Sequence, residues 1–133
     1  VGDLVGLNYG VVQTNSYNTG TITGVAAYDA RFIGGLVGYN VAGSIANSNN
    51  RGTVSAGSHN YVGGVAGYQE QAGASITNVY NNANVTGYHV VGGIVGENHG
   101  SITSAYNVSN TYDNAYSNVT TIAGHTFVGG LVG

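Results

Sequence analysis

Residues 91–103 read VGGIVGENHGSIT, which is a hexapeptide of glycine and aliphatic residues, then an amide residue, then a second short apolar stretch. The hexapeptide occurs as VGDLVG (1–6), IGGLVG (33–38), VGGVAG (62–67), VGGIVG (91–96) and VGGLVG (128–133). Consecutive copies begin 32, 29, 29 and 37 residues apart. Such a period is typical of repeat architectures, in which each unit buries its apolar face by stacking on its neighbours.

Each repeat contains three short apolar segments separated by glycine and asparagine, which favour turns. The hexapeptide is the first segment, and the second is centred on Val12, Ile45, Ile76 or Ile102. The third is TIT (21–23), TVS (53–55), NVT (84–86) and, if residues 108–117 are an inserted loop, NVT (118–120). No segment has helical periodicity over a useful length.

We therefore expect an all-β fold, a β-solenoid (parallel β-helix) of about four coils of 29–37 residues, with three short strands per coil. The chain is expected to be a single repeat domain over residues 1–133. Its repeats would be 1–32, 33–61, 62–90 and 91–127, followed by a partial repeat at 128–133. Repeat length varies mainly just before each hexapeptide, so one corner should carry loops and any specific recognition.

If equivalent residues of consecutive repeats stack on each other, the sequence predicts two amide ladders, in which side chains hydrogen-bond from coil to coil. One ladder comprises Asn8, Asn40, Gln69 and Asn98, and the other comprises Asn18, Asn50, Asn81 and Asn107. The same register predicts an apolar core of two stacks, Ile45, Ile76 and Ile102, and Ile22, Val54, Val85 and Val119.

The composition excludes several functional classes. Charged residues make up 5% of the chain, with two arginines and no lysine, which argues against binding nucleic acid or an anionic membrane surface. Cysteine is absent and no apolar run reaches the roughly 18 residues that span a bilayer. The four histidines are scattered. We expect no metal, no cofactor and no catalytic site.

The repeat resembles a known family. VGGLVG followed by asparagine, and then GSI-x-N-x-x-N-x-GTV, resembles the GLUG repeat of large bacterial surface and secreted proteins, including IgA-specific metallopeptidases and filamentous-haemagglutinin-like adhesins. In such proteins the repeats look like a stalk or an adhesive fibre, and catalysis belongs to a separate domain. The zinc motif H-E-x-x-H of a peptidase is absent here.

Aromatic residues near the corners are candidates for a binding surface, since a tyrosine ring offers an apolar face and a hydroxyl. The candidate residues are Tyr28, Arg31, Phe32, Tyr61 and Tyr88. Threonine and serine in the third segments form a second candidate surface, similar to the flat Thr-x-Thr arrays of ice-binding solenoids. Strand propensity and solvent-exposed hydroxyls explain those residues more simply.

The sequence and the resemblance together predict a non-catalytic, extracellular or cell-surface structural module that forms a rod or fibre. The alternative is a ligand-binding solenoid with a glycan-binding or an ice-binding face. The partner would be a further part of a longer chain or a second copy, with residues 128–133 stacked against residues 1–6 of the next copy. Host or cell-surface glycans are the other candidate partner.

Overall fold

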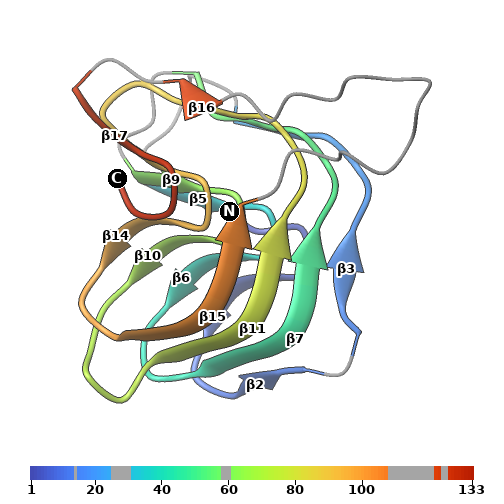
Figure 1. Ribbon diagram of the computed structural model, residues 1–133, viewed down its shortest axis with the longest axis vertical. Coiled ribbons are helices and arrows are strands. Elements are labelled where there is room, and N and C mark those ends of the chain that lie inside the picture. The colour runs from blue at the N-terminus through green and yellow to red at the C-terminus, as the bar shows by residue number, and fades with distance from the viewer. Residues whose placement is uncertain (14, 25–30, 58–60, 108–121, 124–125) are drawn as a thin grey trace.

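The computed structural model describes residues 1–13, 15–24, 31–57, 61–107, 122–123 and 126–133. All regular elements in these ranges are short β-strands, and every pair of neighbouring strands is parallel. The described part contains no helix that could span a membrane. The stacked parallel strands confirm the predicted all-β solenoid (Figure 1).

The strands form four sheets, which we number in the order in which the chain passes through one coil. Sheet I contains β5 (Phe32–Gly34), β9 (Tyr61–Gly63), β13 (Val90–Gly92) and β17 (Phe127–Gly129). Sheet II contains β1 (Val5–Asn8), β6 (Val37–Asn40), β10 (Ala66–Gln69) and β14 (Val95–Asn98). Sheet III contains β2 (Val11–Val12), β3 (Tyr17–Asn18), β7 (Ser44–Asn50), β11 (Ser75–Asn81) and β15 (Ser101–Asn107). Sheet IV contains β4 (Ile22–Thr23), β8 (Val54–Ser55), β12 (Val85–Thr86) and β16 (Ile122–Ala123).

The second coil, which runs from β5 to β8, has four strands where the sequence predicted three. The hexapeptide is not one strand, because Gly35 and Leu36 form a bend between β5 and β6. Both Leu36 and Val37 are fully buried. In a continuous strand consecutive side chains point to opposite faces, so two adjacent inward side chains require a corner. The hexapeptide therefore turns the chain from sheet I to sheet II.

The glycines of the hexapeptide allow backbones to approach each other at this corner. A Cβ atom on Gly38 would lie 2.6 Å from the backbone nitrogen of Val1 in the preceding coil. A Cβ atom on Gly35 would lie 2.5 Å from Cγ of Asn50 and closer still to the carbonyl oxygen of Gly64 in the next coil. Carbon atoms in ordinary contact are about 3.5–4.0 Å apart, so a side chain does not fit at either position without a shift.

The core has two parts on either side of this glycine contact. One cluster is built from sheets II and III and the hexapeptide bend, and it includes the predicted stack of Ile45 and Ile76, with Ile102 partly buried against it. The other is built from sheets IV and I and includes the predicted stack of Ile22, Val54 and Val85. The second and third segments therefore contribute to separate clusters.

One core assignment was wrong. In sheet IV, Val85 pairs with Ile122, so the strand Ile122–Ala123 takes the place that was predicted for NVT (118–120). Val119 itself lies outside the described residues. NVT (118–120) repeats the letters of NVT (84–86), which favoured the other alignment. The distance from this column to the next hexapeptide varies from coil to coil, being 11 residues for Ile22, 8 for Val54 and 6 for Val85 and Ile122, so spacing alone did not fix the register in the long fourth repeat.

Candidate functional site: amide ladders and two aromatic surfaces

The first amide ladder follows the ends of the sheet II strands. Nδ2 of Asn8 donates to Oδ1 of Asn40 at 2.9 Å, and Nδ2 of Asn40 donates to Oε1 of Gln69 at 3.0 Å. Nε2 of Gln69 then donates to Oδ1 of Asn98 at 2.8 Å. Asn8, Asn40 and Gln69 are buried, so the hydrogen bonds compensate for removing these amides from water.

The second ladder follows the ends of the sheet III strands. Nδ2 of Asn18 donates to Oδ1 of Asn50 at 2.9 Å, Asn50 donates to Asn81 at 2.8 Å, and Asn81 donates to Asn107 at 2.9 Å. Six of the ladder amides also bond to the turn that follows their own strand: Asn8, Asn18, Asn40, Asn50, Asn81 and Asn98. Nδ2 of Asn50, for example, donates to the carbonyl oxygen of Gly52 at 2.8 Å. One amide thus closes a turn and joins two coils, which explains why these six positions carry Asn.

The predicted binding surface is only partly brought together. Phe32 and Tyr61 pair in register on sheet I, with ring centroids 5.3 Å apart. Tyr88 lies against His89, with centroids 4.7 Å apart. Arg31 is exposed, and its carbonyl oxygen accepts a hydrogen bond from the Tyr61 backbone nitrogen at 2.9 Å. Tyr28 lies outside the described residues.

The structure adds two tyrosines of sheet II to Phe32 and Tyr61. The Phe32 ring centroid lies 4.7 Å from that of Tyr39 and 4.8 Å from that of Tyr68, and Tyr61 lies 5.5 Å from Tyr68. We call these four residues the corner cluster. Their rings meet because the hexapeptide folds β5 against β6, so outward side chains of sheets I and II converge. The sequence predicted a single strand for the hexapeptide, so it did not indicate that the aromatic residues before and after it would meet.

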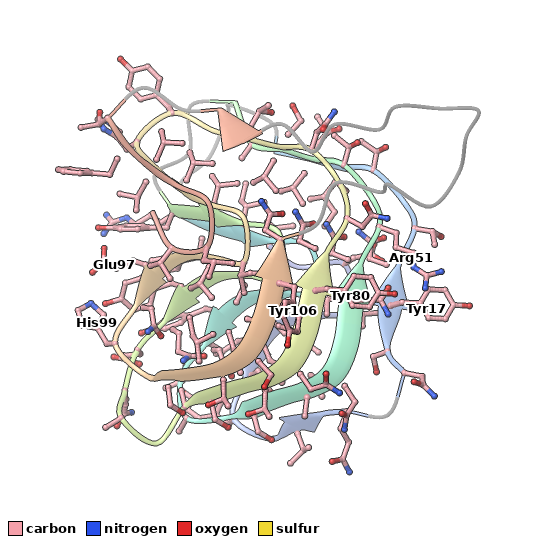
Figure 2. All side chains as sticks on the ribbon, in the orientation of Figure 1. Tyr17, Arg51, Tyr80, Glu97, His99 and Tyr106 are labelled. Carbon is pink, nitrogen blue, oxygen red and sulfur yellow. The ribbon has the colours of Figure 1, made fainter. Side chains whose placement is uncertain are left out.

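Carboxylates flank the corner cluster and alter its acidity. A hydrogen bond with the Glu70 carboxylate, followed by burial, raises the pKa of Tyr39 from 10.0 to about 12. Burial, followed by the charge of Glu97, raises the pKa of Tyr68. Oε1 of Glu97 also lies 2.6 Å from Nε2 of His99, within hydrogen-bonding distance (Figure 2). Within the described residues no group of three or more His, Cys, Asp or Glu could hold a metal ion.

A second aromatic surface lies on sheet III, where the tyrosine column is broken once. Tyr17, Tyr80 and Tyr106 occupy one register position, but Asn49 takes that position on β7 between Tyr17 and Tyr80. Arg51 follows β7, and its guanidinium carbon lies 6.0 Å from the Tyr17 ring centroid and 5.9 Å from that of Tyr80. Figure 2 shows Tyr17, Arg51 and Tyr80 on the side of the view opposite Glu97 and His99.

A column of residues with positive φ runs beside these tyrosines. Asn15, Asn47, Asn78 and Ser104 have φ values of 59°, 48°, 51° and 52°. Nδ2 of Asn78 donates to Oδ1 of Asn47 at 2.7 Å. Asparagine tolerates the left-handed region better than most residues. Its recurrence two residues after Ile45 and after Ile76 was a signal in the sequence that the predictions did not use.

The hydroxyl array on sheet IV is a single column. Thr23, Ser55 and Thr86 share one register position, and Ala123 takes that position on β16. A flat ice-binding face needs a regular two-dimensional array of hydroxyls, and a column interrupted by alanine does not supply it.

The model of the GLUG motif matches residues 33–55 and 58–86. Neither a curated protein nor a solved structure matches the chain. The first match covers β5 to β8 and the second covers β9 to β12, so each motif corresponds to one complete coil. The two matched coils share the glycine corner and the two ladder amides described above. The chain therefore contains GLUG motifs, in two consecutive coils of its solenoid.

Proposed function

We propose that this chain is a non-catalytic structural segment of an extracellular bacterial surface protein, in which stacked coils form a rod. The observation that carries the proposal is the pair of amide ladders, which join consecutive coils in the described stack. Each coil therefore contacts mainly its neighbours, as in other solenoids, and length is added by adding coils. The outward side chains of the corners are then displayed along the rod.

The two outer coils support continuation of the stack. Leu36 of the second hexapeptide is fully buried, whereas Leu4 and Leu131 at the same hexapeptide position are each 44% exposed. A Cβ atom on Gly130 would meet no described atom within 4 Å, although Gly35 at the equivalent position faces the next coil closely. A further coil, from a longer chain or from a second copy, would cover both ends. In the second case residues 128–133 would dock beside residues 1–6, which is an open, heterologous contact.

Sedimentation velocity and electron microscopy over a range of protein concentrations test stacking between copies. We expect concentration-dependent filaments from the unaltered chain, and fewer from Gly130→Ala, because the added methyl group would meet an incoming coil. Gly73→Ala is the control, since a Cβ atom there also meets nothing within 4 Å but lies in a turn away from the hexapeptides. Monodisperse short particles at every concentration would contradict stacking between copies.

The extracellular assignment rests on the family resemblance and on the low charge, which leaves little repulsion between closely packed rods. The chain also has only two residues, Arg31 and Arg51, after which a trypsin-like protease cleaves. An antibody against the chain should label intact cells of the source bacterium. Labelling that appears only after the cells are permeabilised would contradict the assignment.

A further inference from the structure

The broken tyrosine column creates a recess on sheet III. Tyrosine at position 49 would continue the column, but Asn49 is shorter, and the Arg51 side chain extends into the gap between Tyr17 and Tyr80. The resulting recess has a volume of about 510 Å³. Sites for small ligands have volumes of about 300–1,000 Å³. The recess is therefore large enough to hold one sugar residue and to contact the next sugar residue of the same glycan.

The polar groups of the recess are of a kind that binds hydroxyls and carboxylates. Its walls include the amides of Asn15, Asn47, Asn49 and Asn78, together with Arg51 and Tyr80. Oδ1 of Asn49 is buried and accepts no hydrogen bond from the described residues. This oxygen is enclosed by protein, so a ligand in the recess meets the other amides of its lining.

Arg51 supplies the charge of the recess. Its Nη2 donates to the Tyr80 hydroxyl at 2.7 Å, which fixes the guanidinium beside the ring. No carboxylate of the described residues lies within ion-pair distance of it. The guanidinium has five N–H donors in a plane, and this geometry matches a carboxylate in a bidentate arrangement.

We propose that this recess binds an acidic sugar residue of a glycan. The sugar carboxylate pairs with Arg51, the hydroxyl groups bond to the asparagine amides that line the recess, and the apolar face of the ring packs on Tyr80. One cation suits a single carboxylate and not a phosphate backbone, which requires a cluster of cations. The site belongs to three consecutive coils and does not depend on stacking between copies or on the cellular location.

A nitrogen-15 NMR titration of the chain tests the proposal, with three acidic sugars as probes: galacturonic acid, glucuronic acid and N-acetylneuraminic acid. Each acid is compared with its methyl ester, which keeps the shape and removes the charge. We expect at least one acid to shift the side-chain amide signals of Asn47, Asn49 and Asn78, and to bind at least about tenfold more tightly than its ester. No shift with any acid at about 10 mM, or equal binding of acid and ester, would overturn the proposal.

Two variants separate binding from folding. Arg51→Gln should weaken binding of the acid at least about tenfold, because it removes a charge-assisted bidentate contact, while Arg51→Lys retains part of the affinity. Asn49→Tyr should abolish binding and keep the fold, since it restores the residue that Tyr80 and Tyr106 carry at this register position. Tyr9→Ser, which alters an exposed tyrosine outside the recess, is the control. If Asn49→Tyr binds the acid as tightly as the unaltered chain, the recess is not the site.

Discussion

Replacing Gly35 by alanine tests the close contact between hexapeptide and ladder. The new Cβ atom would meet the carbonyl oxygen of Gly64 most closely and would lie 2.5 Å from Cγ and 2.6 Å from Oδ1 of Asn50, so at least about 1 Å of movement is needed to reach ordinary contact. Overpacking of this kind lowers the free energy of unfolding by about 1–3 kcal/mol. Asn50 would also be displaced from its bonds to Asn18, Asn81 and Gly52, which are 2.8–2.9 Å long.

Each buried polar group that loses its partner costs about 1–3 kcal/mol, whereas alanine gains only about 0.4–1 kcal/mol by restricting the unfolded chain. We therefore expect Gly35→Ala to lower the free energy of unfolding by about 3–5 kcal/mol, measured by urea denaturation followed by circular dichroism. Gly130→Ala is matched by motif position and meets no described atom within 4 Å, so it should change the value by less than about 1 kcal/mol in dilute solution. Equal effects of the two substitutions would refute the reasoning.

Three further predictions concern single side chains. Asn81→Leu should lower the free energy of unfolding by about 2–4 kcal/mol in the same denaturation assay, because it removes the ladder bonds to the buried Asn50 and the half-buried Asn107; an unchanged midpoint would contradict a stabilising ladder. Tyr39 should ionise near pH 12 in an ultraviolet absorbance titration, and Glu70→Gln should lower its pKa toward 10.0. Because the folded-state pKa is raised, the stabilisation from neutral Tyr39 is complete below pH 10.0 and is lost as the pH rises through about 12; a titration unaffected by Glu70→Gln would argue against this hydrogen bond. Ser104→Val should lower the free energy of unfolding by about 1–2 kcal/mol and Ser104→Gly should not, since φ is 52° there; equal results would place this residue outside the left-handed region.

The repeated motifs were sufficient to predict which residues stack on each other. Ile45 and Ile76 lie 12 and 14 residues after the start of their hexapeptides, so their register and the ladder Asn50 to Asn81 follow from aligning the motifs and not from a constant distance. The error at Val119 has the same origin, because in the long fourth repeat NVT (118–120) repeats the letters of NVT (84–86), although Ile122 takes the register position of Val85.

The shape of a single coil could not be read from the spacing. Repeat alignment relates equivalent positions in different coils, but it says little about which positions of one coil meet in space. The bend at Gly35 and Leu36 makes β5 and β6 separate strands, and only this bend brings Phe32 to Tyr39. The recess on sheet III was not predicted for a related reason. Asn49 interrupts the tyrosine column, and the gap that it leaves can be recognised only once the neighbouring strands are placed side by side.

Disulfide formation between engineered cysteines tests the central claim, that consecutive repeats are stacked in this register. Thr77 and Thr103 are exposed partners on β11 and β15, and partners in adjacent strands are about 4.8 Å apart, which suits a disulfide. The chain has no native cysteine, so the double substitution Thr77→Cys and Thr103→Cys is free of competing thiols. We predict complete intramolecular oxidation of this pair, and little with Thr77→Cys and Thr86→Cys, which lie in different sheets. Failure of the first pair to close, or equal closure of the second, would contradict the stacked-coil account.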